Sequence, residues 1–465
     1  MIENDAFKLL LINLFHLNPD DIANILCTTF NKMMVLVVTL TDKHQACPYC
    51  GFTAPKIKEY VTKEITHSAL TTQKCIIKYR ARRYKCSCCG KTYYEFNPFV
   101  FKSQKISILT VHNILKDLKD FNETFTSVAR RYHVSPTSVS TIFDNHVDIG
   151  RNPLPEIINF DEVYAFKSEK SKYVCVILDF KKQIPVDILP NRKKEYLLNY
   201  FQKIPLEERK KVKYACSDMY EVYRDVVHKV FPSCCMLLDY FHLSQDFHRK
   251  MNEVRIKVMK GYKDNKASDE YYLLKKFNWL LFKNPEDEDK YGRLFDVERE
   301  RKYNSHFKSY MNYYDLRKKL LEINNDLTIC YSLKLELVDF YSKSTIDNAK
   351  VNLENLIRSC IDTNIDEMIA FSNNLINWKQ EIINSFTIVG TEYKVEADKG
   401  QVVVCNKKVN NAIIENRNKI IKCIKNNANG YTNWSRFRNR VMYVLDPNAT
   451  FSLEPREKQS WMHKT

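Results

Sequence analysis

An acidic pair, Asp161 and Glu162, interrupts a short run of apolar, β-branched and aromatic residues at positions 157–166, which follows Pro153 and Pro155. A run of this kind predicts a buried strand. Charged side chains are seldom buried in a strand unless they are paired or hold a metal ion. The pair is therefore the first candidate for metal-dependent chemistry.

A second carboxylate, Asp218, follows the apolar run 212–217. Three expected antiparallel strands come first, and helices then alternate with two further strands, which is the ribonuclease H-like order. The expected strands cover 157–166, 173–180, 184–189, 212–217 and 236–238, and the expected helices cover 193–203 and 220–230. In that order Asp161 and Asp218 lie on neighbouring strands, where two carboxylates can share a divalent cation.

A third carboxylate, Glu415, lies in a predicted helix over 411–425. At about 100° per residue, one helix face carries four polar residues and the opposite face, which we expect to pack on the sheet, carries three isoleucines. The polar face holds Glu415, Asn418, Lys419 and Lys422, and the apolar face holds Ile413, Ile420 and Ile424. Glu415 could complete the cluster of Asp161 and Asp218, although an exposed Glu–Lys pair is the alternative.

Strand alternation separates the two acids of the first strand, because successive side chains point to opposite faces. Asp161 shares a face with Asn159 and Val163, and Glu162 points the other way. We select Asp161 as the metal ligand and expect Glu162 to support the site or lie near DNA. Asp239 and His242 follow the last short strand; Asp239 could support the site and His242 could contact DNA, with a structural role open for both.

Two Cys-x-x-Cys pairs, each followed by glycine, have the spacing of a zinc ribbon. The expected ligands are Cys47, Cys50, Cys86 and Cys89. Four thiolates in tetrahedral geometry suit Zn²⁺. Cys88 could replace a neighbour, and reduced structural cysteines are the alternative, but the spacing favours Cys86 and Cys89.

The segment 125–143 has the form of a helix-turn-helix, with Ala129 small enough for close packing and Ser135-Pro136 able to begin the second helix. The residues expected to contact DNA are Arg130, Arg131, Thr137, Ser138 and Thr141.

Composition agrees with a DNA-binding protein. Among 465 residues, 73 Lys and Arg exceed 56 Asp and Glu, which gives a net charge of +17 and indicates a polyanionic partner. The 15 cysteines, in a sequence without an evident secretion signal or bilayer-spanning run, predict reduced thiols and a cytoplasmic, nucleoid-associated protein with no membrane partner.

The expected fold class is a multidomain α/β protein: a zinc ribbon, a helix-turn-helix, and a ribonuclease H-like catalytic domain with an α-helical insertion. The expected divisions are an N-terminal zinc-binding domain over 1–100, the helix-turn-helix over 101–150, the first part of the catalytic core over 151–242, the helical insertion over 243–385, the last part of the core over 386–445, and a poorly ordered tail over 446–465. A β-hairpin with its turn at Lys399-Gly400 is expected over 388–404.

At these motifs the chain resembles bacterial insertion-sequence transposases of the DDE type, specifically the ISL3 family. The resemblance runs almost end to end, from Cys47-Pro-Tyr-Cys50 through Ser217-Asp218-Met219 to the basic segment 430–440. It implies a zinc-binding N-terminal domain, a helix-turn-helix, and a catalytic triad whose third acid follows a helical insertion. Carried over by position, the triad is Asp161, Asp218 and Glu415.

The resemblance and the three carboxylates together predict a transposase that binds the ends of its insertion sequence and catalyses strand cleavage and transfer on double-stranded DNA with Mg²⁺ or Mn²⁺. Lys419 and Lys422 would neutralise phosphates, with Asn418 beside them. Arg438 and Arg440 would extend the DNA channel, or else form an exposed basic helix. A dimer or higher oligomer is expected on DNA, since two ends must meet. The alternatives are a DNA-binding regulator without catalysis and a structure-selective nuclease of the same fold.

Overall fold

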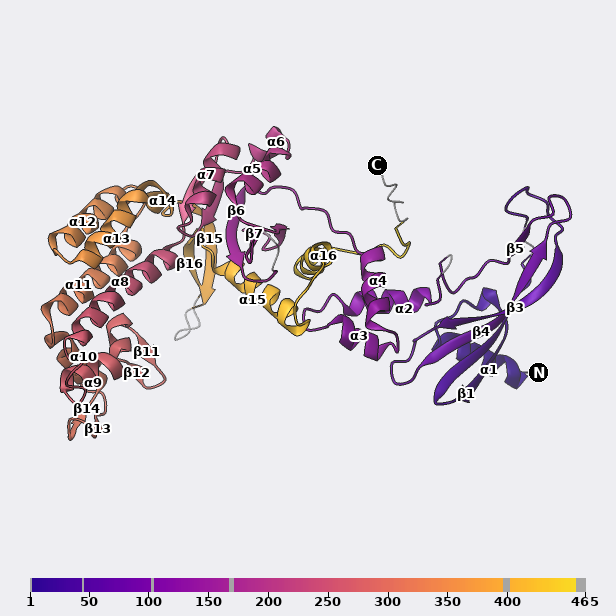
Figure 1. The fold of residues 1–465 in the computed structure, drawn as a ribbon, viewed down its shortest axis with the longest axis horizontal. Helices are drawn as coiled ribbons and strands as arrows, with labels where there is room; N and C mark the ends of the chain where they lie inside the picture. The colour runs from indigo at the N-terminus through magenta and orange to yellow at the C-terminus, as the bar shows by residue number, and fades with distance from the viewer. Residues whose placement is uncertain (1, 44–45, 102–103, 167–170, 396–401, 457–465) are drawn as a thin grey trace.

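The computed structural model describes residues 2–43, 46–101, 104–166, 171–395 and 402–456 (Figure 1). The chain is elongated, with the N-terminal sheet at one end, the helical insertion at the other, and a second sheet between them. None of the helices in the described ranges combines the length and the apolar character that crossing a membrane requires.

The N-terminal part is a sheet covered by one helix. Its elements are α1 (Ile2–Leu14), the short 3-10 helix η1 (Pro19–Asp21), β1 (Ile22–Phe30), β2 (Met33–Leu40), β3 (Lys56–Thr66), β4 (Cys75–Lys85) and β5 (Thr92–Tyr94). The strand order is β1-β2-β4-β3, with β5 paired to β4. Leu11 of α1 and Phe15, which follows the helix, pack on Leu36 and Ile77 of the sheet in one buried cluster.

Three short helices follow: α2 (Ile108–Asp117), α3 (Phe125–Arg131) and α4 (Pro136–His146). The side chains of Thr124 and Ser135 accept backbone hydrogen bonds at the starts of α3 and α4. The prediction that Ser135-Pro136 begins the second helix is therefore confirmed. Ala129 is 2% exposed, as its expected role in close packing requires.

The central sheet consists of β6 (Ile157–Val163), β7 (Val174–Asp179), β8 (Pro185–Leu189), β9 (Tyr214–Ser217) and β10 (Cys235–Leu238). Its order is β10-β9-β6-β7-β8, in which β7 is antiparallel to β6 and β8, while β9 is parallel to β6 and β10. Every predicted strand of this region is found, and most are a few residues shorter than expected.

Helices cover both faces of the central sheet. One face packs on α5 (Lys194–Gln202) and α7 (Glu221–Val230), which flank the short α6 (Leu206–Arg209); the other packs on α15 (Ala412–Asn427) and α16 (Trp434–Leu445). Phe160 belongs to the first layer and Val163 to the second. The predicted alternation along β6 is thereby confirmed.

The insertion is mainly helical and has its own apolar core. Its helices are α8 (Tyr240–Lys260), α9 (Asp269–Lys276), the 3-10 helix η2 (Asn278–Phe282), α10 (Tyr313–Glu322), α11 (Asn325–Lys343), α12 (Ala349–Asp362), α13 (Asp366–Asn377) and α14 (Lys379–Asn384). The expectation of helix alone is wrong at the far end, where four strands form two small hairpins: β11 (Glu288–Asp289) with β12 (Gly292–Arg293), and β13 (Lys302–Asn304) with β14 (Ser309–Met311).

After the insertion, β15 (Ile388–Val395) and β16 (Val402–Lys408) pair antiparallel, as predicted for a hairpin in this segment. The turn expected at Lys399-Gly400 lies outside the described residues. The expected loose tail is wrong for residues 446–456, because this segment packs against α2 and α4: the Ser452 backbone N–H donates to the His146 carbonyl at 3.1 Å, and Arg456 pairs with Asp148.

We expect Phe160→Ala to destabilise the central sheet. The Phe160 ring is fully buried, stacks on Tyr223 at 5.4 Å and meets Phe201 edge-on at 5.9 Å. Removal of such a ring costs about 3–5 kcal/mol, which urea unfolding followed by near-ultraviolet circular dichroism would measure. Phe30→Ala, at a ring that is 62% exposed, is the control and should lose far less; equal losses would contradict the packing described.

Candidate catalytic and metal-binding sites

The backbone pairing of β6 and β9 brings Asp161 and Asp218 together. Asn159 lies opposite Cys216 in this parallel pair. Two residues further along each chain are Asp161 and Asp218, at the same edge of the sheet. The two carboxylates therefore emerge side by side from neighbouring strands, as predicted from the order of the strands.

The start of α15 is fixed to β6 by side-chain amides. Asn159 donates from Nδ2 to Oδ1 of Asn411 at 2.6 Å and to the Asn410 carbonyl at 2.9 Å, and Asn411 donates to the Phe160 carbonyl at 3.4 Å. Both asparagines are fully buried. Because α15 begins directly after Asn411, these bonds determine where Glu415, one turn later, meets the strand.

Asn418 holds the Asp161 carboxylate directly, with Nδ2 donating to Oδ2 at 2.7 Å. The other carboxylate oxygen accepts the backbone N–H of Glu162 at 2.8 Å. Asn418 is only 5% exposed. The expectation that it contacts DNA is therefore corrected: its amide orients a candidate ligand.

Burial disfavours the ionised form of the carboxylates of this site. Burial, with smaller contributions from Asp218 and Glu415, raises the pKa of Asp161 to about 6. Burial also raises the pKa of Asp218. Oδ1 of Asp218 is buried and has no hydrogen-bond partner among the described residues. A cation beside these oxygens would reduce the repulsion between the two carboxylates and would give Oδ1 of Asp218 a partner.

Glu415 also lies close to Asp239 and His242. One ligand atom from each of these three residues lies within 4.8 Å of the other two. Asp239 lies between the end of β10 and the start of α8, and His242 is in the first turn of α8, with Nε2 3.9 Å from Oδ2 of Asp239. Nε2 of His242 is buried and has no hydrogen-bond partner among the described residues. Neither Asp161 nor Asp218 belongs to this group of ligand atoms within 4.8 Å of one another. The charge of Glu415 nevertheless raises the pKa of Asp161, and that of His242 lowers it.

Glu162 points away from Asp161 and binds Arg192, and it also accepts the Tyr223 hydroxyl at 3.2 Å. Burial, with a contribution from Asp218, raises the pKa of Glu162 to about 7. Arg192 lies over the rings of Tyr173 and Tyr220 and counteracts the raised pKa of Asp218. Arg192 was not predicted, because no pattern around it distinguishes it from other basic loop residues.

The residues predicted to contact DNA divide into two groups. Exposed side chains are presented by Arg130, Thr137, Thr141, Lys419 and Lys422. The others have protein partners: Arg131 pairs with Asp117 and Glu123, and the Ser138 hydroxyl hydrogen-bonds that of Ser135 at 2.8 Å.

The expected DNA contacts of Arg438 and Arg440 are corrected by their protein partners, since Arg440 is buried and Arg438 is partly buried in an ion pair. Arg440 is 1% exposed and donates to the carbonyls of Asp120 and Glu123 at 2.8 and 2.7 Å. Arg438 pairs with Asp187 at 2.7 Å. Both side chains therefore attach α16 to neighbouring parts of the protein and are not available to phosphates.

The four predicted cysteines meet in the N-terminal part. Cys47 and Cys89 have their Sγ atoms 3.7 Å apart, and those of Cys50 and Cys86 are 3.5 Å apart. A tetrahedron of thiolates about 2.3 Å from Zn²⁺ has edges of about 3.8 Å, so the donor set and the spacing fit zinc. Gly51 and Gly90 have φ of +74° and +72°, which lets each turn close with an N–H bond to the carbonyl of Cys47 or Cys86.

Comparison with known proteins identifies the family to which this chain belongs. A family model of DDE transposases of the ISL3 type matches residues 158–402. This match covers more than half of the chain, so the chain belongs to that transposase family. It includes Asp161 and Asp218 and ends before Glu415.

One relative extends the similarity beyond that segment. The transposase for insertion sequence element IS1001 of Bordetella parapertussis is 19% identical over 411 residues, which cover 88% of this chain and 91% of the relative. The chain is thus similar to a transposase over nearly its whole length.

We expect the protein to retain about one zinc ion per chain, and Cys50→Ser to lose it because one of four thiolates is removed. Metal content after gel filtration, measured by atomic emission, checks this. Cys88→Ser is the matched control, since Cys88 is exposed, lies in the turn between Cys86 and Cys89, and is outside the four-cysteine group. Loss of zinc from Cys88→Ser but not from Cys50→Ser would contradict the assignment.

We expect Asp161→Asn to stabilise the protein at pH 8 in the absence of added divalent cations. The folded-state pKa of about 6 lies above the usual value near 3.9, so the folded protein binds the proton more tightly than the unfolded chain does. Wild-type stability therefore falls as pH rises from 4 through 6. The variant should gain about 1–3 kcal/mol at pH 8 and nothing near pH 4.

Urea unfolding at the two pH values measures this difference. Asp225→Asn, at an exposed carboxylate paired with Lys194, is the control and should gain nothing. A less stable Asp161→Asn variant at pH 8 would show that the carboxylate is not held in an unfavourable environment.

Proposed function

We propose that this chain binds the ends of its insertion sequence and catalyses metal-dependent strand cleavage and strand transfer, with Asp161, Asp218 and Glu415 as the catalytic acids. The observation that carries the proposal is the buried, unpartnered carboxylate oxygen of Asp218 beside Asp161. An arrangement of this kind is unfavourable for stability alone and is favourable only when a cation or substrate completes it.

We further propose a ribonuclease H-like catalytic domain formed by residues 151–242 and 386–445, with the insertion over 243–385 between its parts. The order β10-β9-β6-β7-β8 supports this, as do helices on both faces of the sheet. The zinc-binding part over 1–100 and the helix-turn-helix over 101–150 precede it.

Carboxylate oxygens are the ligands that Mg²⁺ and Mn²⁺ prefer, and the donor set of Asp161, Asp218 and Glu415 fits either ion. Such ions, when bound, activate water and stabilise the leaving oxygen during phosphodiester cleavage. Asp239 and His242 adjoin Glu415 and are further candidates for holding or orienting groups at this site.

The chain's own residues would divide the remaining tasks. Asn418 donates a hydrogen bond to one oxygen of Asp161 and would thereby fix the orientation of the carboxylate. Lys419 and Lys422 are exposed on the helix that carries Glu415 and would neutralise phosphates near the scissile bond. Arg130, Thr137 and Thr141 are exposed on the helix-turn-helix and would contact duplex DNA.

A dimer or higher oligomer on DNA belongs to the same proposal, because strand transfer needs two ends to be held together. The second candidate function is a zinc and helix-turn-helix regulator without catalysis. A regulator of this kind does not explain why several buried carboxylates lie close together around Asp161, and for that reason we rank it below the transposase.

We expect Asp218→Ala to reduce cleavage of plasmid DNA that carries the flanking ends, in the presence of Mg²⁺, to background. The loss follows from removal of one of two adjacent carboxylates that would hold the cation. Binding of the same ends, measured by gel shift, should stay within about twofold because the exposed DNA-binding residues are untouched. Asp225→Ala is the matched control on the next helix and should cleave as the wild type does.

Each alternative function has its own outcome in this assay. End binding without cleavage by the wild type would indicate the regulator. Cleavage of branched DNA without preference for the ends would indicate a structure-selective nuclease. Equal cleavage by wild type and Asp218→Ala would remove Asp218 from the catalytic site.

A further inference from the structure

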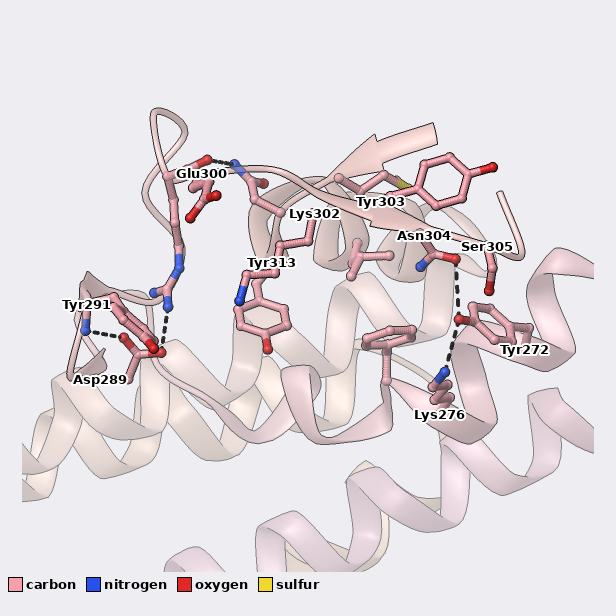
Figure 2. A pocket seen from close by; sticks show the side chains of 15 residues that line it. Tyr272, Lys276, Asp289, Tyr291, Glu300, Lys302, Tyr303, Asn304, Ser305 and Tyr313 are labelled. Carbon is pink, nitrogen blue, oxygen red and sulfur yellow. Dashed lines mark hydrogen bonds and ion pairs between the residues drawn. The ribbon is translucent and has the colours of Figure 1, made fainter. Parts of the chain in front are cut away.

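The far end of the insertion contains a cavity of about 300 Å³. It is formed by α9, the loop that carries β11 and β12, the hairpin β13–β14, and the start of α10 (Figure 2). This end of the insertion is distant from α15 and the central sheet, so the cavity is separate from the carboxylate site (Figure 1). Its volume is at the lower end for small-molecule pockets, which suits one flat ring system.

Aromatic side chains make up a third of the residues that line the cavity. Tyr272, Tyr291, Tyr303 and Tyr313 all line the cavity, and apolar side chains that include Phe277 lie with them. Tyr291 and Tyr303 are 66% and 59% exposed. Tyr303 meets Tyr310 edge-on across its hairpin at 5.5 Å, whereas the groups recorded against the Tyr291 ring, among the described residues, are the cations Lys290, Arg299 and Lys302.

The walls are held in place by hydrogen bonds. The Tyr272 ring stacks on His306 at 3.9 Å with an interplanar angle of 6°, and its hydroxyl meets Oδ1 of Asn304 at 3.3 Å and Nζ of Lys276 at 3.4 Å. At the other end of the cavity, Asp289 accepts the backbone N–H of Tyr291 at 2.8 Å and pairs with Arg299 at 2.6 Å (Figure 2). The cavity is therefore preformed.

Lysines accompany the exposed rings. Lys290 lies 4.6 Å from the Tyr291 ring centre, Lys302 lies 5.9 Å from it, and Lys276 lies 5.2 Å from that of Tyr272. Within the described ranges none of these three lysines has a carboxylate partner. The acids that line the cavity are Asp289, paired with Arg299, and the exposed Glu300.

We propose that this cavity binds an unstacked nucleobase of single-stranded DNA against the ring of Tyr291, with the ring of Tyr303 at the other end of the cavity contacting a neighbouring base and the adjacent phosphates near Lys276, Lys290 and Lys302. Aromatic stacking combined with unpaired cations is the mode by which proteins hold unpaired bases. A duplex cannot use it, because its bases are already stacked. The contact is independent of the catalytic acids and of the helix-turn-helix.

Photocrosslinking of the full-length protein locates this contact. The probe is a single-stranded oligonucleotide with one 5-iodouracil, which crosslinks to aromatic side chains beside it on irradiation, followed by mass spectrometry of the digested protein. The expected result is crosslinked peptides from residues 272–313. Crosslinks confined to other parts of the chain would overturn the proposal.

Matched variants test the role of the rings. We expect Tyr291→Ala/Tyr303→Ala to weaken binding of a fluorescent single-stranded oligonucleotide by about 5- to 100-fold and to leave duplex binding unchanged. Tyr303→Phe keeps the ring and should bind as the wild type does. Tyr60→Ala, at a half-exposed ring on β3, is the control for loss of an exposed tyrosine elsewhere.

The outcomes separate this proposal from the proposed transposase activity. The double alanine variant should still cleave plasmid ends if strand cleavage resides in the carboxylate site, and Asp218→Ala should still crosslink at residues 272–313. Unchanged single-strand affinity in the double variant would overturn the proposal. So would an equal loss for duplex DNA, which would indicate a general electrostatic surface.

Discussion

The hydrogen bond between the side-chain amides of Asn159 and Asn411, 2.6 Å long and fully buried, joins parts of the chain 252 residues apart. It connects the strand that carries Asp161 to the residue from which α15 begins, and therefore to Glu415 and Asn418. Ile414 and Ile421 then pack the helix on the sheet. Hydrophobic packing alone is non-directional, whereas the amide pair has one geometry and determines the position of the helix along the strand.

A second set of contacts attaches helices α2–α4 to the part of the chain that carries the carboxylates. Arg436 of α16 forms a two-pronged pair with Asp144 of α4, and Arg440 bonds the carbonyls between α2 and α3. The residues 446–456 extend this contact along α4. Helices α2–α4 are thus attached to the part of the chain that carries the carboxylates, and under the proposed function their orientation on DNA would also orient those carboxylates.

Much of the site could be predicted because its signals are local. The Cys-x-x-Cys spacing, the acidic residue inside a buried strand and the Ser135-Pro136 helix start each depend on a few adjacent residues. The order of the central strands was predicted from three strands joined by short turns and followed by helices that alternate with strands. The strands of the insertion hairpins are only two or three residues long, which is too short for a repeating pattern to be recognised, so the insertion was predicted as helix alone.

The errors concern residues whose partners are distant in sequence. Ile414 and Ile421 are buried on α15, where Ile413 and Ile420, which are only partly buried, were expected. This rotation of the helix brings Asn418 to Asp161. Arg438 and Arg440 have the composition of an exposed basic helix, yet the acceptors of Arg440 are backbone carbonyls more than 300 residues earlier. Nothing in the residues around Arg440 indicates those acceptors.

The separation of Asp161 from Glu415 also has a consequence for synthesis. The two residues are encoded 254 positions apart, with the whole insertion between them. At a translation rate of about 5–20 residues per second, Asp161 and Asp218 leave the ribosome roughly 10–50 s before Glu415. Until α15 arrives, the nascent chain has an incomplete set of the proposed acids. The contacts of α16 and residues 446–456 with α2–α4 form later still, so the helices and the proposed acids are joined only after α15 has been made.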